Sequence, residues 1–140
     1  MAEPRVALDV EIPSDVRYIE EVVELATRRC RELHLPSQKC SLNLPVALSE
    51  ALSNAILRGN AEGNGKHVRV TAVVSDDAVV IDVADQGPAF DMMAEWIDPT
   101  TPENVVREEG RGLFLMHSLM DRVEHIHDHG NVVRLTLRRE

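Results

Sequence analysis

The amino-acid sequence predicts an α+β domain, a two-layer α/β sandwich in which helices cover one face of a mixed, mainly antiparallel sheet. Two segments near the start of the chain carry apolar residues at the three- and four-residue spacing of amphipathic helices. Two pairs of segments with alternating apolar residues are each joined by a short turn, which predicts two hairpins. The 140 residues suffice to bury one core, so we expect a single domain spanning residues 1–140.

The first strand and the first helix are predicted at the start of the chain. Residues 6–12 alternate between apolar and polar side chains, and Pro13 ends this strand. Ser14 is a suitable N-cap for the helix that follows. Helical spacing continues as far as His34, shortly before Pro36. We interpret this helix as scaffold.

A second helix, residues 44–57, carries two polar residues of interest. Its apolar residues form one stripe, and it ends at Arg58-Gly59-Asn60. Glu50 and Asn54 are one turn apart, so they project from the same side of the helix, beside the apolar stripe. A carboxylate and an amide oxygen at the rim of a pocket suit coordination of a hard cation or activation of an attacking oxygen.

The first predicted hairpin ends in an unusual segment. Its strands are residues 67–74 and 78–84, with a turn at Ser75-Asp76-Asp77. The second strand stops abruptly at Asp85-Gln86-Gly87-Pro88-Ala89-Phe90-Asp91. A carboxylate at a strand end next to a glycine can accept a hydrogen bond from an exocyclic amine such as that of adenine.

The rest of the chain predicts a long connection, a helix and a second hairpin. Residues 92–110 lack periodicity, and a connection of this length is typical of a flexible lid. Gly110-Arg111-Gly112 opens a helix, and glycines at a helix N-terminus are typical of phosphate sites because backbone N–H groups and the helix dipole attract anions. Residues 121–128 and 131–138 form the closing hairpin around His129-Gly130.

Composition limits the classes of function. The net charge of −9 argues against direct nucleic-acid binding and favours a basic partner, or an anionic ligand neutralised locally by a cation and backbone amides. No apolar run approaches the roughly 18 residues of a membrane span, and no secretory signal pattern is visible, so we expect a cytoplasmic protein without membrane association. Cys30 and Cys40 form no CxxC pair, and we interpret both as packing residues in a reducing compartment, with a disulfide between them as the less favoured alternative.

Three histidines alternate near the end of the chain. His125, His127 and His129 would lie on one side of a strand. However, His129 falls at the predicted turn, and no cysteine or acidic cluster accompanies the three in a metal-binding spacing. We therefore interpret them as solvent-facing side chains and not as metal ligands.

Three segments, in this order, resemble the sequence boxes of the GHKL or Bergerat ATP-binding fold. SEALSNAILRGN at residues 49–60 resembles the N box, DQGPAFD at 85–91 the first glycine box, and EEGRGLFLMHSLMD at 108–121 the second. Within this fold the chain is similar to the anti-sigma factor serine kinases of the RsbW type. Three boxes in the right order are a far more specific signal than any one of them.

The resemblance implies an ATP-dependent serine/threonine protein kinase that uses Mg²⁺. By position, Glu50 is the general base for a protein hydroxyl, and Asn54 coordinates the Mg²⁺ bound to the ATP phosphates. Asp85 accepts a hydrogen bond from the adenine amine, and Gly87 leaves space for the adenine ring. The other residues expected around the nucleotide are Phe90, Gly110, Arg111, Gly112 and Leu113.

The resemblance also implies partners. The expected protein is an anti-sigma factor in a partner-switching system. In one nucleotide state it binds a sigma factor, and in the other it phosphorylates an anti-sigma factor antagonist of the STAS type. It further implies a homodimer, with no direct contact to nucleic acid.

Two departures from the family pattern bear on catalysis. Arg58 stands where many members have His, and Glu108 stands where several have an Arg that meets the γ-phosphate. Arg107 or Arg111 are the candidates to replace that charge. If neither does, the chain is a catalytically weak, nucleotide-dependent binding module that sequesters a sigma factor or another regulator. A detached sensor-kinase domain is a third, less favoured reading, because no phospho-accepting histidine helix accompanies it.

Overall fold

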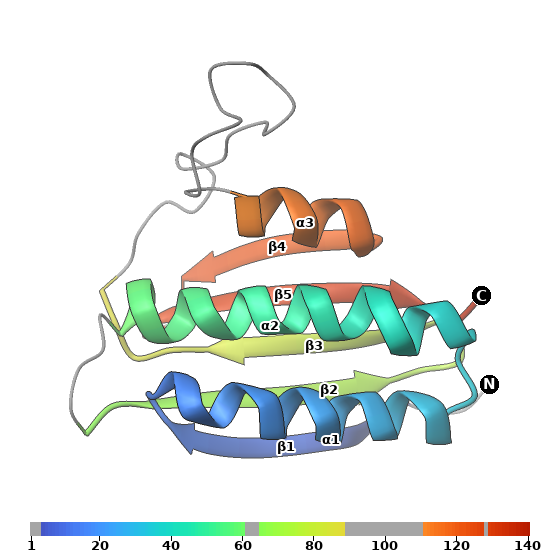
Figure 1. Ribbon diagram of the computed structural model, residues 1–140, viewed down its shortest axis with the longest axis horizontal. Coiled ribbons are helices and arrows are strands. Elements are labelled where there is room, and N and C mark those ends of the chain that lie inside the picture. Colours follow the sequence, from blue (N-terminus) through green and yellow to red (C-terminus); the bar gives the residue numbers. More distant parts are fainter. Residues whose placement is uncertain (1–3, 61–64, 89–110, 128) are drawn as a thin grey trace.

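The computed structural model describes residues 4–60, 65–88, 111–127 and 129–140, and this part of the chain forms a five-stranded sheet with helices over one face (Figure 1). The sheet order is β1-β2-β3-β5-β4, and each described pair of neighbours is antiparallel. The predicted α+β class is therefore confirmed. The strands are β1 (Arg5–Pro13), β2 (His67–Val74), β3 (Ala78–Ala84), β4 (Arg122–His127) and β5 (Asn131–Arg138). The helices are α1 (Ile19–Glu32), α2 (Leu44–Asn54) and α3 (Arg111–Leu119).

The start of the first helix differs from the prediction. A 3₁₀ turn, Val16–Tyr18, precedes α1, and Asp15 is its N-cap, accepting a hydrogen bond from the Arg17 backbone N–H at 3.0 Å. Ser14 is not the cap. Its hydroxyl oxygen instead accepts a hydrogen bond from the side chain of Asn60, 3.0 Å away, so a tertiary contact replaces the local one.

The second helix is the central part of a longer helical run. A π-helical turn, Lys39–Asn43, precedes α2, so the predicted link between the two helices is partly helical. A second π-helical turn, Ala55–Gly59, follows Asn54 directly, and such turns are frequent at functional sites. Among the described helices, none is long and apolar enough to cross a membrane.

The core lies between the sheet and the helix layer, and α2 runs through its middle, with α1 and α3 on either side (Figure 1). Leu48, Leu52 and Ile56 of this helical run are 0%, 0% and 1% exposed. Burial of a side chain of this size contributes roughly 1.5–3 kcal/mol. The core also takes alternate residues of the strands, among them Val70, Ile81, Val83, Leu135 and Leu137. This packing makes α2 a rigid support for its polar residues.

The two cysteines form a disulfide, which corrects the interpretation of both as free packing residues. Cys30 of α1 bonds to Cys40 in the turn before α2, with Cα atoms 5.6 Å apart. That separation suits a disulfide. The chain reverses direction between α1 and α2, and this reversal brings together two residues whose spacing matches no standard motif.

Ion pairs cross the solvent face of the sheet. Arg69 of β2 makes two hydrogen bonds to Asp9 of β1, at 2.8 and 3.0 Å, and Arg134 of β5 makes two to Asp82 of β3, at 2.8 and 2.9 Å. The Arg69 side chain lowers the pKa of Asp9 below its ordinary value of 3.8. The Asp82 carboxylate raises the pKa of Arg134. Both shifts therefore belong to pairs that stabilise the sheet.

Candidate functional site

The second half of α2 carries Glu50 and Asn54. Both are half-buried, whereas Ala51, Leu52 and Ala55 next to them are buried. Because the two residues are four positions apart on a continuous helix, they lie on the same side of α2. The structure therefore places a carboxylate and an amide together near the C-terminal end of this helix.

Asp85 lies just beyond the end of β3 and is only 7% exposed. Its Oδ1 accepts hydrogen bonds from the Gly87 backbone N–H at 2.9 Å, from the Asn131 side chain at 3.0 Å and from the Asn131 backbone N–H at 3.3 Å. These donors offset the cost of burying the carboxylate. All three of these hydrogen bonds, which come from described residues, reach Oδ1.

Asn131, the first residue of β5, holds this carboxylate and is 1% exposed. Its Nδ2 donates both to Asp85 Oδ1 and, at 2.9 Å, to the carbonyl oxygen of Pro88. Its Oδ1 lies 3.1 Å from Nε2 of His125 on β4. Asn131 therefore connects the end of β3 to the hairpin formed by β4 and β5. His125 is half-buried, which corrects its interpretation as a solvent-facing residue, whereas His127 is exposed.

The turn between β4 and β5 closes directly against Asp85. Gly130 has a φ of +143°, and a Cβ atom there would overlap the carbonyl oxygen of Asp85. The Asp85 backbone N–H also donates to the Asn131 carbonyl at 2.8 Å. Only a glycine at position 130 lets the turn approach this closely.

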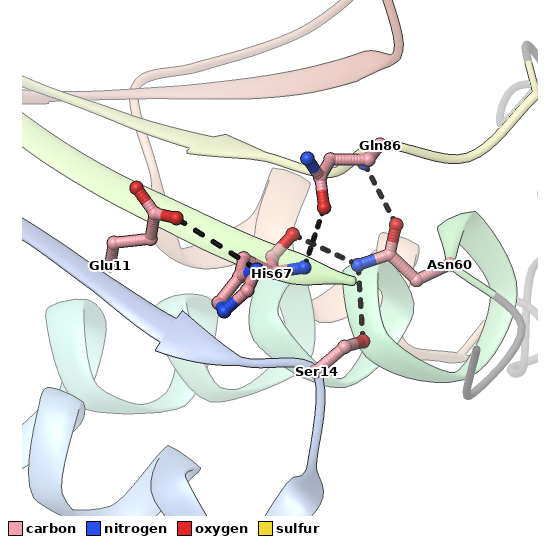
Figure 2. A network of polar contacts seen from close by, with 5 residues as sticks. All are labelled: Glu11, Ser14, Asn60, His67 and Gln86. Carbon is pink, nitrogen blue, oxygen red and sulfur yellow. Dashed lines mark hydrogen bonds and ion pairs between the residues drawn. The ribbon is translucent and has the colours of Figure 1, made fainter. Parts of the chain in front are cut away.

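Asn60 is the centre of a second polar network, which Figure 2 shows. This residue is fully buried, and its Nδ2 donates to Ser14 Oγ and to the His67 carbonyl, both at 3.0 Å. Its Oδ1 accepts a bond from the Gln86 backbone N–H at 2.8 Å, and the Gln86 side chain accepts one from the His67 backbone N–H at 2.6 Å. The ring of His67 lies 3.9 Å from the Glu11 carboxylate.

This network connects the two halves of the site. Gln86 directly follows Asp85, and Asn60 ends the helical run that contains Asn54. The bond between Gln86 and Asn60 therefore holds the end of β3 against the end of that run. Movement of one half relative to the other would break this partly buried hydrogen bond.

The N-terminus of α3 lies at the same end of the molecule. The Asn43 side chain at the start of α2 donates to the Leu119 carbonyl at the end of α3, at 2.8 Å, so the two helices run antiparallel. The start of α3 at Arg111 is therefore at the end of α2 that carries Asn54, the end toward which β3 also runs (Figure 1). Helix N-terminal N–H groups suit an anion.

Some of the predicted site residues do not belong to the described part of the chain. Phe90, Gly110 and the predicted lid at 92–110 lie outside the described residues, as do Arg107 and Glu108. Arg111, Gly112 and Leu113 form the helical start of α3.

The sequence reasoning missed the residues that hold Asp85. Asn131 starts a strand in which Val133, Leu135 and Leu137 all face the core, so a polar residue in that register was a usable signal for a buried polar contact. The sequence pattern places Asn60 at a helix end and at the last position of the N-box segment, and it places Gly130 in a turn. Their contacts are tertiary, and no local pattern reveals them.

The open antiparallel sheet, its single layer of helices and the polar end formed by α2, β3 and α3 define a GHKL-type ATPase fold. Residues 12–137 match the family model of the histidine kinase-like ATPase domain, and the chain belongs to this family. The resemblance drawn from the three boxes is thereby confirmed.

Several curated relatives are serine-protein kinases of the RsbW type. The chain is 40% identical over 100 residues to RsbW of Bacillus licheniformis and 35% identical over 99 residues to RsbW of Bacillus subtilis strain 168. Each match covers 67% of this chain and 62% of the relative's length. An anti-sigma F factor of Clostridium beijerinckii is 26% identical over 99 residues, covering 70% of this chain and 69% of that protein.

Proposed function

We propose that this chain is an ATP-dependent serine/threonine protein kinase that acts as an anti-sigma factor and phosphorylates an anti-sigma factor antagonist. The names of the relatives support this proposal, because they combine a serine-protein kinase with an anti-sigma factor. The observation that carries it is the arrangement around Asp85, a buried carboxylate whose Oδ1 is held by the protein at the end of a strand. In this proposal Oδ2 accepts a hydrogen bond from the adenine amine, and Gly87 leaves room for the ring.

The phosphate end of the site is assigned to α2 and α3. Asn54 offers an amide oxygen, a ligand type that suits Mg²⁺ alongside phosphate oxygens. The start of α3, with Arg111, Gly112 and Leu113, offers backbone N–H groups to the phosphates. Phe90 and Gly110 complete the proposed nucleotide contacts from sequence alone. Bound Mg²⁺ would neutralise the negative charge that phosphoryl transfer must stabilise.

Glu50 is the proposed catalytic base. Its carboxylate accepts the proton of a serine or threonine hydroxyl on the partner, whose oxygen then bonds to the γ-phosphorus of ATP as the bond to the ADP oxygen breaks. The half-buried position of Glu50 on the same side of α2 as Asn54 supports this role. The products are ADP and a phosphoprotein.

The proposed partners follow from the same assignment. They are a sigma factor, a STAS-type antagonist that carries the accepting hydroxyl, and a second copy of this chain in a homodimer. A cytoplasmic location belongs to this proposal, because sigma factors act on transcription inside the cell.

The nucleotide site is tested by calorimetric titration of nucleotide-free protein with ATP, with and without Mg²⁺. We expect Asp85→Asn to abolish measurable binding, and Asn54→Ala to lose mainly the Mg²⁺-dependent part. Asp82→Asn is the matched control, since this carboxylate lies on β3, three residues before Asp85, but pairs with Arg134 on the solvent face. Failure of the wild-type protein to bind ATP would refute the proposal.

Kinase activity is tested with γ-labelled ATP and a purified STAS-domain antagonist of an RsbW relative. We expect the wild type to label the antagonist and Glu50→Gln to bind ATP without labelling it. If the wild type binds ATP but transfers no phosphate, the chain is the nucleotide-dependent binding module instead.

A further inference from the structure

A histidine on β4 is connected to the proposed adenine-reading carboxylate through one intervening residue. His125 Nε2 lies 3.1 Å from Asn131 Oδ1, and Asn131 Nδ2 lies 3.0 Å from Asp85 Oδ1. Asn131 and Asp85 are 1% and 7% exposed, so this chain of contacts is shielded from water for most of its length. Hydrogen bonds in such surroundings hold side chains more firmly than those at the surface.

The direction of each hydrogen bond in this chain is set by its partners. The Asn131 amide nitrogen faces Asp85 Oδ1 and the Pro88 carbonyl, which both accept, so the nitrogen end of the amide must point there. The amide oxygen then faces His125, and Nε2 of the imidazole must carry a hydrogen and donate. His125 thereby adds a hydrogen bond at the oxygen end of the Asn131 amide and restricts the movement of this side chain.

We propose that His125 is a positioning residue for base recognition, acting through Asn131 on the Asp85 carboxylate. The inference rests on the proposed ATP-binding function. The Asn131 side chain donates to Asp85 only while its amide has the observed orientation, whereas the Asn131 backbone N–H donates in either case. Once His125 no longer donates, the Asn131 amide oxygen loses its partner, and the side chain is held against Asp85 Oδ1 only through its nitrogen. The carboxylate is then held less firmly in the orientation in which Oδ2 is available to an exocyclic amine.

This mechanism predicts a selective effect on the amine of the base. Purine riboside triphosphate differs from ATP in lacking the exocyclic amine, so the ratio of the two affinities measures recognition of that group. We expect His125→Ala to lower the affinity for ATP about tenfold, which corresponds to the loss of one buried hydrogen bond. The affinity for purine riboside triphosphate should stay within about twofold of wild type, because that ligand does not use the contact.

Two further variants make the titration decisive. His125→Gln retains an N–H donor at a similar reach, so it should restore most of the preference for ATP. His127→Ala is the control on the same strand, since it removes a neighbouring imidazole, whose ring centroid is 4.6 Å from that of His125, and leaves the bond to Asn131 in place. Thermal denaturation of each variant shows whether the fold is intact.

The outcomes separate the two proposals. If the wild type binds neither ligand, the proposed nucleotide function fails. If the wild type prefers ATP and His125→Ala keeps that preference, the positioning role alone is wrong. Equal losses for both ligands, or an equal loss in His127→Ala, would show that His125 merely supports the fold and would also overturn the inference.

Discussion

Gly130 packs directly against the backbone of Asp85, in the turn between the last two strands. Its φ of +143° lies in a region that side chains with a Cβ rarely adopt, and an added Cβ would overlap the Asp85 carbonyl oxygen. The proposed adenine-reading carboxylate is thus positioned by a turn that is 45 residues further along the chain. The last hairpin belongs to the site although it contributes no predicted ligand contact.

Gly130→Ala should therefore damage both stability and nucleotide binding. The backbone conformation costs about 1–3 kcal/mol for a residue other than glycine, and the overlap with Asp85 adds to this. We expect the free energy of unfolding to fall by at least about 2 kcal/mol and ATP affinity to fall more than tenfold. Urea denaturation and calorimetric titration measure the two effects.

Gly65→Ala is the matched control for that substitution. Gly65 also has a positive φ, of +81°, but no atom lies within 4 Å of the position that its Cβ would take. The substitution should cost about 1–2 kcal/mol of stability from backbone strain alone, with ATP affinity unchanged. Equal losses of affinity in both variants would contradict a specific role for the contact between Gly130 and Asp85.

Asn60→Ala should destabilise the protein by about 3 kcal/mol. The substitution leaves the Gln86 N–H and the His67 carbonyl without the buried partners they have now, and each unsatisfied group costs about 1–3 kcal/mol. Ser14→Ala removes just one of the Asn60 contacts and should cost about 1 kcal/mol. Urea denaturation at neutral pH measures the free energy of unfolding of both variants. Similar losses in Asn60→Ala and Ser14→Ala would mean that the network does not depend on Asn60.

The helices and strands of this protein can be predicted from local sequence patterns, whereas the polar contacts that hold its site residues cannot. The alternation in residues 67–74, 78–84 and 131–138 predicted β2, β3 and β5 with the same boundaries, because strand periodicity depends on which face is buried. The helical stripe at 44–57 likewise predicted α2. The polar contacts of Asn60 and Asn131 instead join segments that lie far apart in the chain, so their partners follow only from the assembled fold.

The cysteines illustrate the same limit and lead to a prediction about reduction. Cys30 and Cys40 are 10 residues apart, and a disulfide closing a loop of this size stabilises the folded state by about 2–3 kcal/mol through the entropy of the unfolded chain. Dithiothreitol should therefore lower the urea midpoint of the wild type. The double variant Cys30→Ala, Cys40→Ala should show a low midpoint with and without reductant. If reductant leaves the urea midpoint of the wild type unchanged, the disulfide does not contribute to stability.

The pair formed by Asp9 and Arg69 predicts a specific acid sensitivity. Hydrogen bonding from Arg69 lowers the pKa of Asp9 below 3.8, so the folded state binds this proton less readily than the unfolded state does. The stabilisation is therefore present above the unfolded pKa and is lost as the pH falls through the folded pKa, in a window below about pH 4. The Arg17 backbone N–H lowers the pKa of Asp15 in the same direction, so this carboxylate adds to the effect.

Asp9→Asn should consequently make stability less dependent on pH in the acid range. We expect the urea midpoint of the wild type to fall more between pH 5 and pH 2.5 than that of Asp9→Asn, with a residual slope from Asp15 and other carboxylates. Arg69→Gln should flatten the acid dependence similarly, because it removes the group that lowers the pKa of Asp9. The double variant should resemble either single variant, since each already breaks the same pair. If the midpoints of wild type and Asp9→Asn fall in parallel, the pair does not couple proton binding to folding.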